Sequence, residues 1–458
     1  MDADVSDSPG TPADPDRPDH SAGGGPADGP RDAAGAAPED DAAVPPSGGD
    51  RGSGADGSDG GAPDGTWGER PAREPQGRGR PWLRWTALAA SLLVLVAAGV
   101  GWWLYKKLDG NITTDTSAAA ELKAYEKERP RPIARDAQNI LLIGSDTRSG
   151  DNSAYGRDDG GSQRSDTTIL LHLAADRGSA TAVSIPRDLM AEIPSCHTDD
   201  GKATTKRFAQ FNSAFELGGT ACTIRTVEKM TGIRVDHHMV IDFNGFKDMV
   251  DAVDGVEVCL KEPVDDPDAH LKLPAGRQKL DGEEALGYVR ARKSIGNGSD
   301  TERMDRQQKF LGALVNKMQS NGVLLNPTRL YPVLDAATKS LTTDPGLDSL
   351  RDLYDLVRGM RNVPTEKVQF LTVPRRSYPA NPNRDELVQP DADQLFAQLR
   401  KDEVVTVVPP EEIESGDSQT DHSSGNDTSG RKSGDTDASP TPAPTYSGSN
   451  AADDLCGS

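Results

Sequence analysis

The hydrophobic pattern of the chain is dominated by one long apolar segment, Thr86–Tyr105, which contains twenty residues and no charge. A helix of that length rises by about 30 Å, which matches the hydrocarbon core of a bilayer. A buried core helix and a cleaved signal peptide are the alternatives. Core helices are seldom uncharged over such a length, and signal peptides lie within the first ~30 residues. The pattern therefore predicts a transmembrane helix over residues 86–105.

Charged and aromatic residues flank the predicted span and indicate its orientation. Five arginines precede it and two lysines follow it, so the positive-inside rule places the N-terminus in the cytoplasm and residues from about 106 onward outside. Aromatic side chains lie at both ends, where interfacial belts are expected. The flanking residues are Arg70, Arg73, Arg78, Arg80, Arg84, Lys106 and Lys107, and the aromatic ones are Trp82, Trp85, Trp102, Trp103 and Tyr105.

Beyond the predicted span, short apolar segments alternate with segments of helical periodicity. Strands are predicted over Asn139–Ile143, Thr167–Leu173, Thr181–Ile185, His238–Ile241, Val256–Leu260 and Val368–Val373. Helices are predicted over Phe208–Met230, Phe243–Val253, Glu283–Arg292, Thr301–Ser320, Leu330–Ser340, Leu347–Met360 and Ala392–Leu399. Such alternation predicts an α/β fold, an α-β-α sandwich around a central mixed sheet.

Composition divides the rest of the chain. Residues 1–70 hold 16 acidic and 4 basic side chains among Gly, Pro, Ala and Ser, and residues 410–458 hold 10 acidic and 2 basic ones. Such segments bury too little apolar surface to offset chain entropy. We therefore expect a disordered acidic cytoplasmic tail over 1–85, a stalk over 106–136, a folded extracytoplasmic domain over 137–408 and a disordered tail over 409–458.

The same two segments explain the net charge of −22, because they carry 20 of those negative charges. The part between them is nearly neutral, so the acidity of the whole chain says nothing about the ligand of the folded domain. A near-neutral domain also lacks the basic footprint of a nucleic-acid-binding protein.

All four cysteines follow the predicted span, which is compatible with disulfides in an oxidising compartment. Four cysteines allow three pairings, and the pairing Cys196–Cys222 is our prediction. Cys259 lies in the strand-like segment GVEVCL, where a small buried hydrophobic residue is an equal alternative.

Two carboxylates lie at predicted strand ends. Asp146 follows the apolar run NILLI, and Asp166 directly precedes TTILLHL. Two acids brought to one end of a sheet repel each other unless a cation lies between them, and Mg²⁺, or Mn²⁺, suits oxygen ligands beside a phosphate. Capping of a turn or helix is the alternative for each Asp on its own.

Arginines form a second group at strand and helix ends. Arg164 flanks Asp166 and Arg187 follows the third predicted strand, while others lie in ALGYVRAR and in the helix that Asp300 is predicted to cap. Guanidinium groups match phosphate oxygens bidentately, so several of them with a divalent metal suit a diphosphate. A surface ion pair is the alternative for each. The remaining arginines are Arg290, Arg292 and Arg303, and Gln307 lies one helical turn after Arg303.

Seven segments in fixed order resemble the LytR-CpsA-Psr family of cell-wall assembly proteins. They are NILLIGSDTR, RSDTTILLHL, VSIPRDL, FNSAFELGG, GIRVDHHMVIDFNGF, LDGEEALGYVRAR and DTERMDRQQ, which cover roughly residues 137–320, with a weaker likeness to about 400. Each segment alone is short, but their order just beyond one membrane span is specific.

The resemblance implies a phosphotransferase that moves a polyprenyl-diphosphate-linked glycan onto peptidoglycan through a phosphodiester. Asp146 and Asp166 match the family's magnesium-associated acids. They are expected to act with Arg164 and Arg290 in catalysis. The residues that match the family's diphosphate ligands are Arg164, Arg187, Arg290, Arg292, Arg303 and Gln307.

Other functions stay open at the level of sequence. A lipid diphosphate hydrolase would use the same head-group site with water as acceptor, and a non-catalytic scaffold would only bind lipid-linked wall precursors. A Ser-His-Asp or Cys-His set with a nucleophile signature is missing from the sequence, so we expect direct transfer without a covalent enzyme intermediate. His172, His237 and His238 lie in or beside predicted strands and are expected to be structural.

Overall fold

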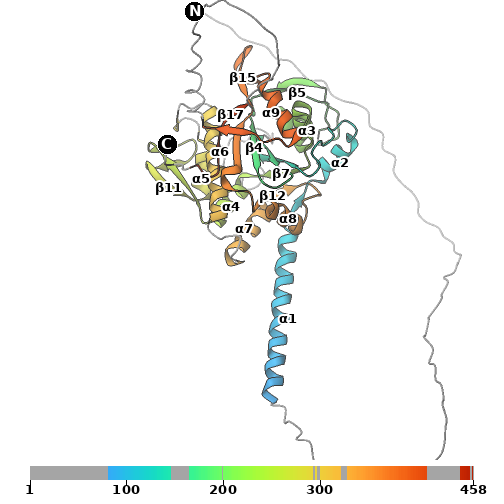
Figure 1. The fold of residues 1–458 in the computed structure, drawn as a ribbon, viewed down its shortest axis with the longest axis vertical. Helices are drawn as coiled ribbons and strands as arrows, with labels where there is room; N and C mark the ends of the chain where they lie inside the picture. Colours follow the sequence, from blue (N-terminus) through green and yellow to red (C-terminus); the bar gives the residue numbers. More distant parts are fainter. Residues whose placement is uncertain are drawn as a thin grey trace, which may run out of the picture. The chain divides into compact units, whose positions relative to one another are not determined.

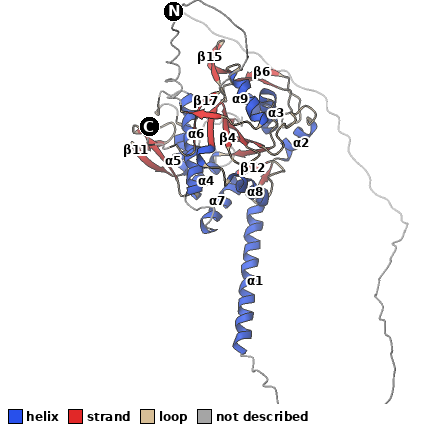
Figure 2. Cartoon of the chain, in the orientation of Figure 1, coloured by secondary structure: helices blue, strands red, loops and turns tan. Residues whose placement is uncertain are grey.

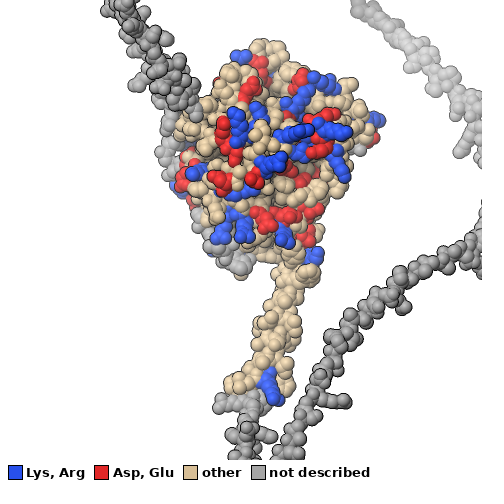
Figure 3. All heavy atoms as spheres, turned by 45° about the vertical axis from the view of Figure 1, so that its right-hand side comes forward, with Lys and Arg blue, Asp and Glu red and all other residues tan. Residues whose placement is uncertain are grey.

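The computed structural model describes residues 81–145, 165–198, 200–291, 294–296, 300–320, 327–409, 444–453 and 456. The first element is the helix α1 (Pro81–Asp109), whose side chains are almost uncharged along its length (Figure 3). Within the described ranges it is the one helix long and apolar enough to cross a membrane. It extends the predicted span by about a turn at each end, and Pro81 occupies the first position, where its missing N–H costs nothing.

A mixed sheet of nine strands forms the centre of the domain, counted over the described residues (Figures 1 and 2). Neighbouring strands are parallel in the pairs β1/β12, β7/β2, β4/β13 and β17/β16 and antiparallel in the others. In spatial order the strands are β1 (Thr113–Thr114), β12 (Leu341–Thr343), β7 (His237–Ile241), β2 (Gln138–Ser145), β3 (Ser165–Leu173), β4 (Ala180–Ile185), β13 (Val368–Thr372), β17 (Thr445–Asn450) and β16 (Thr406–Val408).

Helices cover both faces of this sheet because successive strand residues point to opposite sides. Leu141 and Ile143 pack in a core with α2 (Thr116–Ala124), α3 (Ser213–Thr231) and α9 (Asp391–Lys401). Leu142 instead packs in a second core, with α6 (Asp300–Ser320) and α8 (Leu350–Met360). The predicted α-β-α sandwich around a mixed sheet is thus confirmed.

A third core lies among α4 (Phe243–Ala252), α5 (Gly282–Arg290), α6 and α7 (Pro327–Ser340), beside two short hairpins. The small strand pairs of the fold are β8 (Val256–Leu260) with β11 (Gly276–Leu280), β9 (Val264–Asp266) with β10 (Leu271–Leu273), β5 (Met190–Ile193) with β6 (Arg207–Gln210), and β14 (Arg375–Tyr378) with β15 (Asn381–Leu387). A 3-10 turn, Thr365–Lys367, precedes β13.

The segment predicted as a stalk, 106–136, is part of the folded domain. Its residues form β1 and α2, and Leu122 is buried in the first core. Asp109, the last residue of α1, accepts a hydrogen bond from the Leu350 N–H of α8 at 3.2 Å. The prediction, a stalk leading into a short helix, missed this packing because a polar strand of two residues gives no hydrophobic signal.

The predicted disorder over 409–458 is also wrong for its last part. Thr445–Asn450 forms β17 between β13 and β16, and Tyr446 is 5% exposed. Gly448 permits this close pairing, because a Cβ there would lie 2.2 Å from the Phe370 carbonyl oxygen. The segment joins the sheet through main-chain hydrogen bonds, which a polar composition does not reveal.

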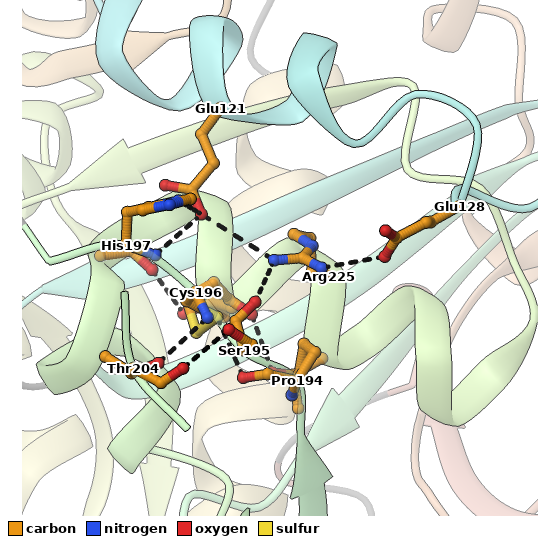
Figure 4. The surroundings of a disulfide bond; sticks show 12 residues. Glu121, Glu128, Pro194, Ser195, Cys196, His197, Thr204 and Arg225 are labelled. Atoms are coloured by element: carbon orange, nitrogen blue, oxygen red, sulfur yellow. Dashed lines mark hydrogen bonds and ion pairs between the residues drawn. A yellow bond between two sulfur atoms is a disulfide. The ribbon is translucent and has the colours of Figure 1, made fainter. Parts of the chain in front are cut away.

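Two disulfides join the four cysteines. Cys196–Cys222 is present as predicted and ties the loop after β5 to α3. Beside it the Arg225 guanidinium donates to the Ser195 carbonyl and to Glu128 and stacks 3.4 Å from the Tyr125 ring centroid (Figure 4). Cys259 is not a free buried residue, because it pairs with Cys456.

Candidate functional site

Several of the site residues that the sequence predicts lie near one edge of the central sheet, as far as the structure describes them. Strands β2, β4, β7 and β13 run in one direction and end at this edge, where the antiparallel β3 begins. Ligands of open α/β sheets bind outside such carboxyl ends of strands. We call this edge of the sheet the arginine edge. It is defined by the strand positions Gly144 and Ile241, Ser145 and Ser165, Thr168 and Ile185, and Ser184 and Thr372, which pair there.

Arg187 reaches the arginine edge because it follows the last residue of β4 by two positions. Its Nε donates to Asp188 Oδ2 at 3.2 Å, and its carbonyl accepts the Asn212 N–H. Asp188 Oδ1 also accepts from Gln210 Nε2 at 2.6 Å and from Arg384 Nη1 at 3.2 Å. This network holds the turn after β4 against β6 and β15, so the position of Arg187 is fixed from several sides.

A second arginine and a buried acid join the first turn of α6 to this network. Arg375 donates to Asp385 Oδ2 and to Thr301 Oγ1, both at 2.6 Å. Burial raises the pKa of the Asp385 carboxyl, and it also raises the pKa of Asp305 on α6; the charge of Arg375 acts against both shifts. Arg375 thus joins the start of α6 to the acid of β15.

Arg303 lies one turn into α6 and is 5% exposed. Its Nη2 lies 2.8 Å from Asp300 Oδ1, three residues earlier in the helix. The helix begins at Asp300, where the sequence predicts its cap, and an acid at this end suits the helix dipole. The ion pair keeps the guanidinium at the start of α6.

Arg290 is the last residue of α5, where a positive charge suits the helix dipole. A capping box between Asp281 and Glu284 fixes the other end of this helix. The Arg290 guanidinium carbon lies 4.6 Å from the ring centroid of Phe243, which opens α4 two residues after β7. This cation–π contact places Arg290 beside the arginine edge.

Gln307 and its two neighbours anchor α6 to the rest of the site. Gln307 Nε2 donates to the Val289 carbonyl at 3.2 Å, and Arg306 donates to carbonyls of the same helix end. Gln308 Nε2 donates to Ser184 Oγ at 3.0 Å and to Thr372 Oγ1 at 2.9 Å. Arg306 and Gln308 were missed from the sequence; their place beside Gln307 in DRQQ was the available signal.

Four predicted site residues lie wholly or partly outside the described residues. They are Asp146, Arg164 and Arg292, together with the side chain of Asp166, whose backbone belongs to β3. The pairing of Ser145 with Ser165 shows that the residues just before the two aspartates are neighbours. Over the described part of the chain, no three His, Cys, Asp or Glu side chains form a metal-holding group.

The three histidines lie near the opposite end of these strands. His172 contacts Asn139 at 2.8 Å and Asp402 at 2.9 Å, which ties β3 to the end of α9. His237 and His238 begin β7 and pair with Asp344 and Asp115. A pocket of about 330 Å³ also lies at this end, and the predicted site residues are not among those that line it. These contacts agree with the expected structural role.

Comparison with known proteins supports the relation that the sequence motifs indicate. The LytR_cpsA_psr family model matches residues 108–401. Cell wall biosynthesis protein LcpA of Corynebacterium glutamicum is 33% identical over 353 residues, which is 70% of this chain and 65% of the relative. The probable cell wall biosynthesis protein LcpB of the same organism is 40% identical over 236 residues, 50% of this chain and 54% of the relative.

The alignment with a third relative covers a larger share of that relative. The polyisoprenyl-teichoic acid–peptidoglycan teichoic acid transferase TagT of Bacillus subtilis is 28% identical over 299 residues, 64% of this chain and 85% of the relative. The alignments with the two Corynebacterium proteins span less than two thirds of those proteins. The family model alone covers well over half of the 458 residues, so the chain belongs to the LytR-CpsA-Psr family.

Proposed function

We propose that this protein is a transferase that attaches a polyprenyl-diphosphate-linked glycopolymer to peptidoglycan through a phosphodiester. The observation that carries the proposal is the arginine edge, where Arg187, Arg290 and Arg303 come from three different elements. Guanidinium groups match phosphate oxygens bidentately, so arginines carried by neighbouring segments suit a diphosphate with its several negative charges. The name of the related TagT, a teichoic acid transferase that acts on peptidoglycan, supports the same reaction class.

The proposed step is a direct displacement at phosphorus. A hydroxyl oxygen of the acceptor sugar attacks the phosphorus that carries the glycan, and the bond to the bridging oxygen breaks. Polyprenyl phosphate leaves with the bridging oxygen, and the hydroxyl proton passes to Asp146 or Asp166. The arginines stabilise the charge that builds on the leaving phosphate, which is the main requirement of phosphoryl transfer.

A magnesium ion is part of the proposal, with Asp146 and Asp166 as its protein ligands. Support comes from the adjacent positions of Ser145 and Ser165, which bring the chain to one place just before each acid. Oxygen ligands next to a phosphate suit Mg²⁺, and Mn²⁺ would fit the same ligands. When bound, the metal would neutralise part of the diphosphate charge.

Membrane topology belongs to the proposal as well. α1 fits a single-pass anchor, and we place its N-terminal side in the cytoplasm and the catalytic domain outside. The two disulfides support this orientation, because such bonds persist in oxidising compartments.

The test uses the full chain in lipid nanodiscs with a polyprenyl-diphosphate-linked sugar, Mg²⁺ and peptidoglycan oligomers. Mass spectrometry should find a sugar-phosphate adduct on the oligomer, and a chelator should abolish it. Arg290→Ala should lower the rate about 100-fold, as expected when one contact to developing charge is lost. Arg351→Ala is the control, because Arg351 is an exposed arginine on α8.

Other outcomes would replace the proposal. Free sugar phosphate without an adduct would identify a hydrolase. An unchanged but tightly bound lipid would identify a scaffold. A phosphorylated side chain trapped during turnover would contradict direct transfer.

A further inference from the structure

The last turn of α5 is held by side chains of α6. The final carbonyls of a helix have no partner within the helix and need one elsewhere. Here Arg306 Nε donates to the Tyr288 carbonyl at 2.8 Å and Nη2 donates to the Ala291 carbonyl, while Gln307 takes the carbonyl of Val289. Three carbonyls at one end of α5 thus depend on two adjacent residues of α6. The two helices lie beside each other in the fold (Figure 1).

Arg306 is an unusual residue for this task. It is only 6% exposed, and its guanidinium carbon lies 5.7 Å from the Tyr288 ring centroid. Burial of a charged group is costly unless its donors are used, and here neutral carbonyl oxygens accept from it. The guanidinium fork is what allows one side chain to reach two carbonyls at once.

Arg290 lies between the carbonyls that Arg306 holds. Tyr288 precedes it and Ala291 follows it, so both sides of its backbone are fixed to α6. Beyond its backbone, its guanidinium rests on Phe243 of α4. The backbone around Arg290 is therefore held by α6, through Arg306 at Tyr288 and Ala291 and through Gln307 at Val289.

We propose that Arg306 is a positioning residue that orients Arg290 toward the diphosphate of the substrate. This inference rests on the proposed function, because it assumes that Arg290 binds the diphosphate. In this proposal Arg306 does not contact the substrate. Loss of the guanidinium fork should therefore weaken diphosphate binding only while Arg290 is present.

The test is a double-mutant cycle on the full chain in nanodiscs, with geranyl diphosphate as the calorimetric probe. Arg306→Lys keeps the charge but loses the planar fork whose two nitrogens reach the two carbonyls. We expect it to raise Kd about tenfold beside Arg290 and less than about twofold in the Arg290→Ala background. Arg306→Gln, which retains one amide donor, is the second variant and should show the same dependence on Arg290.

Arg225→Lys is the matched control, because Arg225 is 7% exposed and donates to the Ser195 carbonyl in a different part of the domain. It should lower Tm without changing Kd. Equal loss of binding in both Arg290 backgrounds, or in Arg225→Lys, would show general loosening and overturn the inference alone. An unchanged Kd in Arg290→Ala would remove Arg290 from the proposed site, and the inference with it.

Discussion

At the residue scale, a buried ion pair between Arg129 and Glu228 anchors the segment after α2 to the domain. Arg129 Nη2 donates to Glu228 Oε1 at 2.7 Å, and its Nε contacts both carboxylate oxygens. Their side chains are 10% and 3% exposed. Glu228 Oε1 also accepts the Val235 N–H, so one carboxylate joins α3, the start of β7 and the segment after α2.

Glu228→Ala should therefore be strongly destabilising, by about 3–5 kcal/mol, because it removes the carboxylate closest to a buried guanidinium. Urea unfolding of the full chain in nanodiscs measures the loss. Lys202→Ala serves as control, since Lys202 pairs with Asp200 on the surface, and its unfolding midpoint should not move. Equal midpoints for both variants would contradict a structural role for Glu228.

At the scale of elements, a histidine–aspartate pair closes the loop between β12 and α8 onto β7. His237 Nδ1 lies 3.2 Å from both oxygens of Asp344, and Asp344 also accepts the His238 and Gly346 N–H groups. The hydrogen bond to Asp344 raises the pKa of His237 against its partial burial. Burial of Asp344 acts to raise its own pKa, but the bond from His237 lowers it overall.

A raised His237 pKa predicts that stability depends on pH in one direction. Its contribution is complete below the unfolded value of about 6.5 and disappears as the pH rises through the higher folded value. We expect the wild type to lose stability relative to His237→Asn as the pH is raised from about 6.5 upward. Urea midpoints across that range measure the difference, and a constant difference would refute the prediction. Asp236 and Asp352 act on His237 in the same sense.

Elements with strong apolar patterns were predictable, and those that depend on partners were not. The cores of β2, β3 and β4 are apolar runs, which the sequence pattern identifies within one or two residues. Phe208–Gln210 was predicted as the start of a helix, yet these residues belong to β6 because Met190–Ile193 pairs with Arg207–Gln210. The preference of a short polar segment is weaker than the hydrogen bonds that a neighbouring strand offers.

The candidate site divides in the same way. The motifs identified Arg187, Arg290 and Arg303, and the structure gives each of them fixed neighbours. Arg306 and Gln308 were not predicted, because their partners lie at a helix end and at two strand ends that are far from them in the sequence. Adjacent residues of a helix point about 100° apart, so DRQQ serves two sides of α6.

At the scale of the whole molecule, the Cys259–Cys456 disulfide joins the segment that follows β17 to the β8–β11 hairpin. β17 pairs with β13 on one side and β16 on the other. Cys259→Ser/Cys456→Ser should lower the free energy of unfolding by about 2–5 kcal/mol, because the link restricts the unfolded chain. Urea midpoints without reductant measure this, and wild type treated with a reductant should fall at least as far. An unchanged midpoint in the double variant would show that β17 holds without the link.

The place of β17 has a consequence for export. If the domain emerges residue by residue from a translocation channel, β13 appears long before Thr445–Asn450 can cover it. β16 cannot take its place in the meantime, since its strand partner is β17. Until then the side of β13 that faces away from β4 presents unpaired N–H and C=O groups, which are a template for aggregation. If the domain is exported in this way, its folding includes an interval in which β13 is exposed to aggregation, and that interval lasts until Thr445–Asn450 arrives.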